Sequence, residues 1–186
     1  MPRAGVTVDR VVSTAADLAD RDGADALTLS RVADELGVRT PSLYSHIDGL
    51  DDLLRRVAVL GVVQLGERCR TAAMGTRGAA ALAAIAGAYR AFAGERPGVY
   101  LLTQAVPPDD PDHRAASQRL LEPVLAALAG FGLEGDDAIH AARSIRSALH
   151  GFVLLEQHQG FGLEVDVDTS FAWMIRTLTA ALETRD

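Results

Sequence analysis

Apolar residues recur every three or four positions along most of the chain, and no segment alternates convincingly between apolar and polar positions. The first clear case runs from about residue 7 to residue 21, where the apolar positions form one stripe and three aspartates lie opposite. This period is that of an amphipathic α-helix, whereas a strand requires a period of two. Similar spacing predicts helices at about 49–73, 79–94, 111–130, 136–159 and 169–183, and a short one within 95–106. The chain is therefore expected to be all-α.

Two shorter helices are predicted between the first helix and the long one that starts near residue 49. Thr28 begins the first of them, because its hydroxyl can accept a hydrogen bond from a free N–H of the next turn. Gly37 ends this helix after two turns. Thr40 caps the second short helix, which extends from Pro41 to about Ile47. Proline suits the first helical position because its missing N–H would have no partner there.

The two short helices have the form of a helix-turn-helix, in which the second helix enters the major groove of DNA. Leu43 and Ile47 lie four residues apart and would anchor the second helix on the helices before it. Its other face would then be free to reach base edges and phosphates. The candidate DNA-contacting residues are Thr28, Arg39, Thr40, Pro41, Ser42, Tyr44 and His46. The same spacing also suits a plain three-helix packing unit with an ordinary solvated surface, and the pattern leaves this alternative open.

Composition limits what this helical protein can bind. The 186 residues carry a net charge of −7, so contact with nucleic acid must be local and not the effect of a positive field around the whole molecule. A single cysteine, Cys69, excludes an internal disulfide and most cysteine-based metal sites. No apolar run approaches the roughly 18 to 20 residues of a membrane span, and the N-terminus has no apolar signal core. We therefore expect a cytoplasmic protein with no membrane partner, no cofactor and no metal.

The segment from residue 8 to residue 60 resembles the N-terminal domain of TetR/AcrR-family transcriptional regulators. The matching parts are an alanine-rich first helix ending in "DG", the sequence "ALTLSRVADELGV", the "LYSHI" recognition helix and the leucine-bearing start of the next helix. Farther along, "GAYRAFAGERPGVY", "SIRSALHGFVLLE" and "GFGLEVDVDTSF" are similar to the C-terminal domain of a subgroup named for its Trp-His-Gly motif. Here Leu149 replaces the tryptophan before His150 and Gly151. Together the matching segments cover nearly the whole chain.

The resemblance implies a repressor that acts as a homodimer on a palindromic operator and leaves the DNA when a small apolar or amphipathic effector binds. It also implies a helix-turn-helix DNA-binding domain at residues 1–49 and a helical domain for effector binding and dimerisation at residues 50–186. Aromatic walls with a few polar groups suit the effector pocket, for which we expect Tyr89, Phe92, Tyr100, Gln104 and His150. The last two long helices offer more apolar face than one subunit should cover. The predicted dimer interface contains Phe152, Leu155, Phe171, Met174 and Leu178.

The start of the long helix after residue 47 departs from the family pattern. Most members carry a lysine there, directed at a phosphate, whereas this chain has Asp48, followed by Asp51 and Asp52. Residues 1–56 contain seven arginines and ten acidic residues, which gives a net charge of −3. Asp48 is predicted to cap the helix, but a carboxylate at a helix N-terminus opposes the binding of a phosphate there. We therefore expect few phosphate contacts and a modest affinity for DNA.

Two other classes of function compete with that of a regulator. An enzyme would draw its catalytic groups from His113, His140, His150, Glu156 and His158. None of these forms a metal-binding pair four residues apart with a third ligand, and no glycine-rich phosphate loop or nucleophile elbow is present. No catalytic or metal site is therefore expected. The acidic N-terminal segment leaves one more alternative open, a dimeric small-molecule-binding protein whose DNA-binding domain is weakened or lost.

Overall fold

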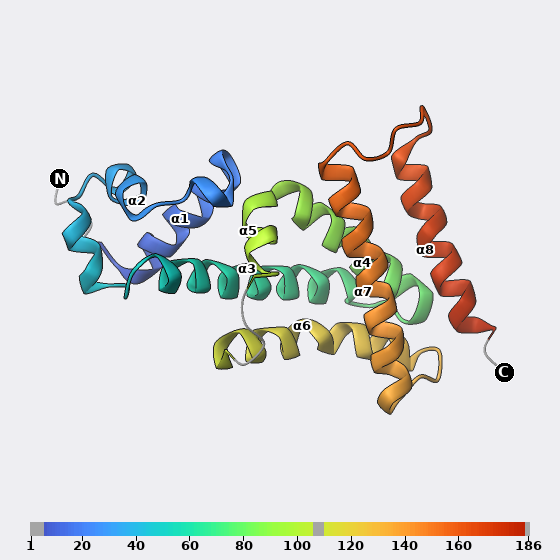
Figure 1. Ribbon diagram of the computed structural model, residues 1–186. Coiled ribbons are helices and arrows are strands. Elements are labelled where there is room, and N and C mark those ends of the chain that lie inside the picture. The colour runs from blue at the N-terminus through green and yellow to red at the C-terminus, as the bar shows by residue number, and fades with distance from the viewer. Residues whose placement is uncertain (1–5, 106–109, 185–186) are drawn as a thin grey trace. The chain divides into compact units, whose positions relative to one another are not determined.

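The computed structural model describes residues 6–105 and 110–184, and over these ranges the chain is helical throughout, without a strand (Figure 1). Eight α-helices and two short 3-10 helices follow one another in these ranges. They are α1 (Val8–Asp22), η1 (Ala24–Ala26), α2 (Leu29–Leu36), η2 (Thr40–Ser45), α3 (Leu50–Ala73), α4 (Gly78–Glu95), α5 (Pro97–Leu102), α6 (Pro111–Ala129), α7 (Gly135–Gln157) and α8 (Val167–Glu183). The predicted all-α fold is confirmed. No helix in the described part of the chain is long and apolar enough to cross a membrane.

The helices form two compact units, and the long helix α3 runs from one into the other. The first unit comprises Met1–Val62 and Arg96–Ala115, and the second comprises Val63–Glu95 and Ala116–Asp186. The chain therefore leaves the first unit within α3 and returns to it after Glu95, for α5. The boundary predicted at residue 49 falls inside the first unit, which is built from two separate stretches of sequence.

Local signals at both ends define α1. The Thr7 hydroxyl accepts a hydrogen bond from the Arg10 N–H at 3.3 Å, which satisfies one of the free N–H groups of the first turn. Gly23 follows the helix with φ +90°, a backbone region that residues with a side chain rarely adopt. The buried face of α1 consists of Val11, Val12, Ala15, Ala16, Leu18 and Ala19. This stripe, predicted from the spacing of apolar residues, supplies part of the core of the first unit.

Helix α5 packs closely against α1 and α3 in the first unit. A Cβ atom added at Gly98 of α5 would lie 2.0 Å from the carbonyl oxygen of Ala19 in α1. A Cβ atom added at Gly61 of α3 would lie 2.6 Å from Cγ1 of Val99 in α5. Both distances are far shorter than van der Waals contact, so both positions require glycine. Gly98 thus brings the backbones of α5 and α1 together, and Gly61 leaves room on α3 for the side chains of α5.

Three helices of the second unit meet around Arg90 of α4. Its guanidinium pairs with Glu156 of α7 and, at 2.7 Å, with Asp168 of α8. The same group lies 4.8 Å from the ring centroid of Phe171 and 5.6 Å from that of Phe152, distances suited to cation–π attraction. The hydrogen bond with Glu156 is the main cause that raises the pKa of Arg90. A permanently charged group therefore ties α4, α7 and α8 together.

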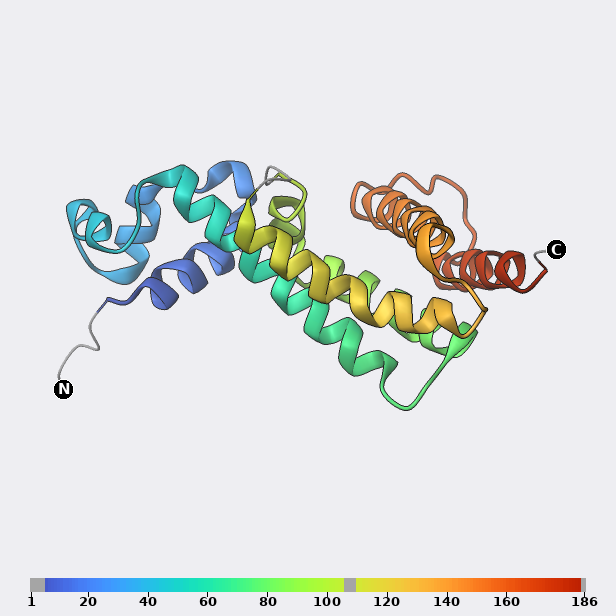
Figure 2. The ribbon, with the colours of Figure 1, turned by 90° about the horizontal axis from the view of Figure 1, so that it is seen from below.

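Helix α6 runs beside the C-terminal part of α3 in the second unit (Figure 2). A Cβ atom added at Gly66 of α3 would lie 3.3 Å from the Cα of Leu120 in α6, so the two helices approach closely at this glycine. One turn farther along α3, Cys69 is fully buried and lies 4.0 Å from the Ile85 carbonyl oxygen of α4. Burial raises the pKa of the Cys69 thiol to about 12. The thiol stays protonated at neutral pH and acts as a packing residue.

The second short helix differs from its prediction. The sequence pattern predicts an α-helix from Pro41 to Ile47, whereas the structure has a 3-10 helix, η2, from Thr40 to Ser45. The Ser42 N–H donates to the Arg39 carbonyl at 2.8 Å, which is the i to i+3 bond of a 3-10 helix. The His46 N–H donates to the Leu43 carbonyl at 2.8 Å in the same way, and bonds of this kind suit a short segment such as η2.

Candidate DNA-binding site

A short helix and a glycine turn lead into the segment that contains most candidate DNA-contacting residues. Thr28 caps α2, since its hydroxyl accepts a hydrogen bond from the Arg31 N–H at 3.3 Å. Gly37 follows α2 in the left-handed conformation, with φ 68° and ψ 34°. The Val38 N–H then donates to the Ala33 carbonyl at 3.0 Å. This is the bond pattern of a Schellman motif, which reverses the chain tightly after a helix.

Buried side chains hold η2 in place after this turn. Leu43 is fully buried, and Ile47 has only 2% of its surface exposed. Val32 of α2 is also fully buried, so the two short helices contribute to the same core. The N–H groups of His46 and Ile47 both donate to the Leu43 carbonyl, at 2.8 and 3.1 Å. With its apolar residues turned inward, the segment from Arg39 to His46 presents its polar residues outward.

The seven candidate residues lie at the cap of α2 or between residues 39 and 46. Those that are exposed are Thr28, Arg39, Pro41, Ser42 and Tyr44, whereas Thr40 and His46 are half-buried. Tyr44 has 59% of its surface exposed, an unusual position for an aromatic ring. The face therefore offers a phenol, a guanidinium, an imidazole and hydroxyls, the groups that proteins use to contact phosphates and base edges.

Most arginines of the first unit are paired with carboxylates of the same unit. The pairs are Arg21–Glu35, Arg31–Asp22, Arg55–Asp110, Arg56–Asp52 and Arg96–Asp20. Arg39, by contrast, forms no ion pair with any carboxylate in the described ranges. An exposed guanidinium without such a partner needs no rearrangement before it meets a phosphate or the edge of a guanine. A contact between Arg39 and DNA stays a prediction, which this unpaired guanidinium favours.

Acidic residues dominate the start of α3. The sequence pattern predicts Asp48 as the capping residue of this helix. The helix begins at Leu50, so Asp48 lies one residue before the capping position. Its backbone N–H donates instead to the Asp52 carboxylate at 3.1 Å. Burial opposes ionisation of Asp52, but hydrogen bonds from Arg56 and from the Asp48 N–H outweigh burial and lower the pKa of Asp52. The carboxylate is ionised at neutral pH, and the start of α3 is an unfavourable place for a DNA phosphate.

This arrangement of charges predicts a shallow dependence of operator binding on salt. Each phosphate neutralised by the protein contributes about −0.9 to the slope of log K against log salt. With most arginines paired and acids at the start of α3, we expect a slope shallower than about −8 for the dimer. Fluorescence anisotropy between about 50 and 200 mM salt measures it. A steeper slope would show instead that the paired arginines leave their carboxylates for DNA.

The five residues predicted for the effector pocket are distributed over both units. Tyr89, Phe92 and His150 belong to the second unit, whereas Tyr100 and Gln104 belong to the first. Phe92 and Tyr100 are fully buried, Tyr89 is nearly so, and Gln104 is exposed. Burial, together with a nearby guanidinium, lowers the pKa of His150, so its imidazole is neutral at pH 7. A role of these five residues in effector binding stays a prediction.

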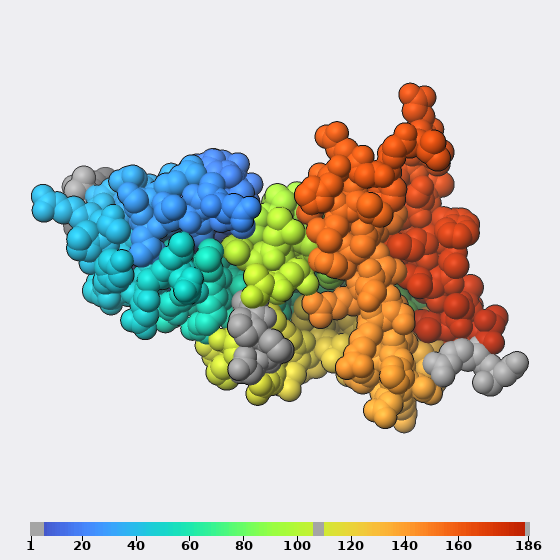
Figure 3. All heavy atoms as spheres, viewed as in Figure 1, coloured from blue at the N-terminus to red at the C-terminus, as the bar shows by residue number. Residues whose placement is uncertain are grey.

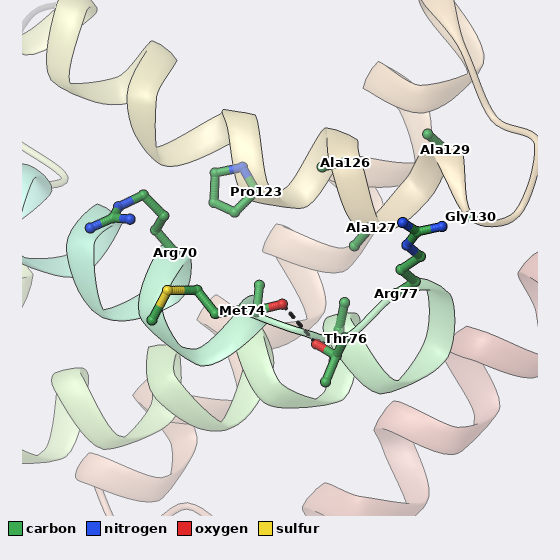
Figure 4. Close-up of a pocket in the computed structure, with 11 residues that line it drawn as sticks. Arg70, Met74, Thr76, Arg77, Pro123, Ala126, Ala127, Ala129 and Gly130 are labelled. Carbon is green, nitrogen blue, oxygen red and sulfur yellow. Dashed lines mark hydrogen bonds between the residues drawn. The ribbon is translucent and has the colours of Figure 1, made fainter.

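A cavity of about 490 Å³ lies in the second unit, between the turn from α3 to α4 and the C-terminal part of α6 (Figure 4). Its walls are mostly small residues, namely Ala73, Ala81, Pro123, Ala126, Ala127, Ala129 and Gly130. Arg70 and Arg77 stand at its two ends, with Met74 between them. None of the five predicted pocket residues lines this cavity. Short side chains that leave a cavity between helices produce no periodic pattern of residues. The runs of alanine and glycine are the only sign of this cavity in the sequence.

The residues predicted for a dimer interface differ in their exposure. The rings of Phe152 and Phe171 pack against each other within the subunit, with centroids 5.1 Å apart, and both side chains are buried. Leu155 has 49% of its surface exposed, and Met174 and Leu178 are half-buried. The exposed residues of this set are thus available to a second subunit, whereas the two phenylalanines stabilise the subunit itself.

Trp173, which has 63% of its surface exposed on α8, was not among the residues predicted for the dimer interface. It precedes Met174 and lies off the stripe that packs inside the subunit, and a tryptophan in that position was the available signal. The connector between α7 and α8 projects from the surface of the second unit (Figure 3) and exposes Leu163 and Val165 to 82% and 62%. Large apolar side chains therefore remain uncovered at α8 and at the connector before it.

Both parts of the chain match known family models. Residues 11–57 match a family described as "Bacterial regulatory proteins, tetR family", and this match contains α2, the turn at Gly37 and η2. Residues 82–178 match "Tetracyclin repressor-like, C-terminal domain". Membership of the subgroup with the Trp-His-Gly motif stays a prediction.

Relatives and solved structures agree with these matches. The HTH-type transcriptional regulator Rv0681 of Mycobacterium tuberculosis is 37% identical over 197 aligned residues, which cover 99% of this chain and 90% of the relative. A protein of unknown function from Rhodococcus sp. RHA1 has a similar fold, with a TM-score of 0.83 and 22% identity over 97% of each chain. The TetR family protein ActR of Streptomyces coelicolor, in complex with actinorhodin, has a TM-score of 0.73 and 19% identity, covering 98% of this chain and 100% of that chain. From the helix-turn-helix, the two family matches and the full-length relative, we conclude that this chain belongs to the TetR family of bacterial transcriptional regulators.

Proposed function

We propose that the protein is a homodimeric repressor that binds a palindromic operator and releases it when a small apolar or amphipathic molecule binds. One observation supports the DNA-binding part above all: Leu43 and Ile47 are buried and hold a segment whose outer side bears Tyr44 and Arg39. In a dimer, two such segments about 34 to 36 Å apart would meet successive major grooves on one side of the duplex. The relative from Mycobacterium tuberculosis, named as a transcriptional regulator, is consistent with this role.

The response to a ligand is supported by the fold. ActR, a TetR family protein with the same fold, was solved in complex with actinorhodin. In this chain the effector would contact some of the five predicted residues, or occupy the cavity between the turn from α3 to α4 and α6. The apolar walls of that cavity and the guanidinium groups of Arg70 and Arg77 suit an amphipathic anion. Binding and release of DNA need no chemical step, and we propose no reaction for this chain.

Dimerisation through α7 and α8 is supported by their exposed apolar residues. Leu155 and Trp173 each leave about half or more of their surface in water, at 49% and 63%. Burial of such side chains against a second copy would stabilise the dimer by about 1.5 to 3 kcal/mol for each side chain. A two-fold axis would place the same patch on both subunits. Each apolar residue of the patch would therefore be buried once on each subunit.

DNase I footprinting on the DNA upstream of the gene tests the proposal. We expect one protected palindrome at low salt, and we expect protection to end when the right small molecule is added from a metabolite library. Protection that no compound relieves would contradict the ligand-responsive part while leaving DNA binding intact.

The charge of the N-terminal segment favours one other candidate function. A net charge of −3 over residues 1–56 is unusual for a surface that must approach DNA, and it suits a dimeric small-molecule-binding protein whose DNA-binding domain is weakened or lost. The footprinting experiment separates the two functions. Absence of protection at low salt, both on the upstream DNA and on fragments selected from the whole genome, would favour this second candidate.

A further inference from the structure

The carboxylate of Asp20, near the end of α1, holds the start of α5. One oxygen accepts a hydrogen bond from the backbone N–H of Val99 at 2.9 Å, and the other pairs with the guanidinium of Arg96. The first N–H groups of a helix have no partner within the helix, and Arg96, the capping residue of α5, offers no side-chain hydrogen bond to them. Asp20 therefore caps α5 from a helix that lies 79 residues away in the sequence.

We propose that Asp20 and Arg96 are positioning residues for DNA binding: they lock α5 onto α1 and so fix where the helix-turn-helix lies in the first unit. Neither residue belongs to the face that meets DNA. The side chains of Asp20 and Arg96 have only 14% and 24% of their surface exposed, so their pairing is better shielded from water than an ordinary surface ion pair.

The packing beside this pair leaves little freedom for α5 to shift. A six-residue helix is not stable alone in water, so α5 depends on its neighbours. Gly98 brings the backbone of α5 against the Ala19 carbonyl of α1, and Gly61 brings α3 against Val99. The carboxylate cap, the ion pair and two close glycine contacts thus act on the same short helix.

A chain of contacts leads from this lock to η2. The two residues after Asp20 continue it: Arg21 pairs with Glu35 of α2 at 3.0 Å, and Asp22 pairs with Arg31 of α2 at 2.5 Å. Helix α2 is joined to η2 by the tight turn at Gly37 and by their shared buried side chains. A displacement of the end of α1 would therefore move α2 and η2 with it.

The test replaces Asp20 with alanine and with asparagine. Asparagine can still accept the hydrogen bond from the Val99 N–H but loses one of the two carboxylate charges that attract Arg96, the other being that of Asp17 at 3.3 Å. The matched control is Asp166→Ala, because the Asp166 carboxylate also caps a helix, accepting a hydrogen bond from the Thr169 N–H at 2.7 Å, but in the second unit. All proteins are compared at a temperature and concentration at which each is folded and dimeric.

Amide hydrogen exchange gives the first measurement and needs no DNA. In Asp20→Ala we expect the amides of α2 and η2 to exchange about tenfold faster or more, with a smaller change in Asp20→Asn and none in Asp166→Ala. Unchanged exchange in α2 and η2 would overturn the proposal.

Operator binding gives the second measurement and rests on the proposed function. The operator defined by footprinting is compared with versions whose half-sites are one base pair closer or farther apart. We expect Asp20→Ala to bind the native operator about tenfold more weakly and to discriminate less between the three spacings, because its helix-turn-helix is less fixed. Equal weakening for all three spacings would show that Asp20 and Arg96 only stabilise the fold, and it would overturn the proposal. If the wild-type protein binds no operator, the proposed function is wrong. Hydrogen exchange alone then tests whether Asp20 and Arg96 fix the position of α2 and η2.

Discussion

Replacement of Arg39 or Tyr44 by alanine is expected to weaken operator binding on the order of a hundredfold, because a side chain that contacts DNA is worth about 1 to 3 kcal/mol and a dimer loses it twice. Both side chains are exposed on the outer side of the segment anchored by Leu43 and Ile47. The fold should be unaffected, since neither side chain contributes to the core. Electrophoretic mobility shift or fluorescence anisotropy with the footprinted operator measures the change.

The matched control is Arg119→Ala. Arg119 is also an exposed arginine, but it lies on α6 in the second unit and does not line the cavity, and we expect its removal to change affinity by less than about threefold. The two DNA-contacting variants should also differ from each other. Loss of Arg39 should reduce the salt slope by about one phosphate contact per subunit if the guanidinium binds a phosphate, and should relax specificity at one base pair if it binds guanine. Wild-type affinity in both variants would show that another surface contacts DNA.

Replacement of Trp173 by alanine is expected to raise the dissociation constant of the homodimer about a thousandfold. Tryptophan residues at the centre of an interface contribute about 2 kcal/mol or more, and a two-fold axis doubles the loss. Since 63% of the side chain is exposed in the single subunit, its removal should leave the subunit folded, with a melting temperature close to that of the wild type. Sedimentation equilibrium over a range of protein concentrations gives the dissociation constant.

Met74→Ala serves as the control for this prediction. Met74 is an apolar side chain of similar exposure, 61%, at the turn from α3 to α4, and it belongs to neither of the last two helices of the chain. Its removal should leave the dimer intact. Because a palindromic operator needs both subunits at once, Trp173→Ala should also lose operator affinity at low protein concentration and recover part of it at high concentration. A Trp173→Ala protein that remains a dimer at nanomolar concentration would place the interface elsewhere.

The parts of the fold that the sequence predicts well are those that local signals determine. Thr28 and Gly37 define the two ends of α2 through hydrogen bonds and backbone angles that involve only neighbouring residues. The buried positions Leu43 and Ile47 follow from their spacing. The choice between an α-helix and a 3-10 helix for η2 could not be predicted, because over so few residues the two differ by little energy and packing decides between them.

Features that depend on distant residues were beyond the sequence pattern. The count of charges in residues 1–56 was correct, but it could not show that Arg31 and Arg21 are occupied by carboxylates whereas Arg39 is not. The partners of Gly98 and Gly61 could not be predicted, since a glycine that lets a distant segment approach leaves no periodic pattern in either segment. The seven candidate DNA-contacting residues could be proposed from the sequence because helix-turn-helix geometry is local, and their contact with DNA stays a prediction, whereas the cavity and the exposure of Trp173 required the packing of the second unit.

The construction of the first unit from two separate stretches imposes an order on folding during synthesis. Residues 6–62 leave the ribosome well before α5 has been synthesised. The Asp20 carboxylate can accept its hydrogen bond from the start of α5 only when the donor, 79 residues later in the chain, has been made. Until then the face of α1 that receives Gly98 is open to solvent, and α2 and η2 are attached to a helix whose end is not yet held. The loop that must close is long but its entropic cost grows only slowly with length, so the delay is set by the rate of translation and not by the stability of the contact. A nascent regulator therefore gains a finished DNA-binding unit only after all of α4 and then α5 have been made, and a product truncated before Arg96 would display an unfinished one.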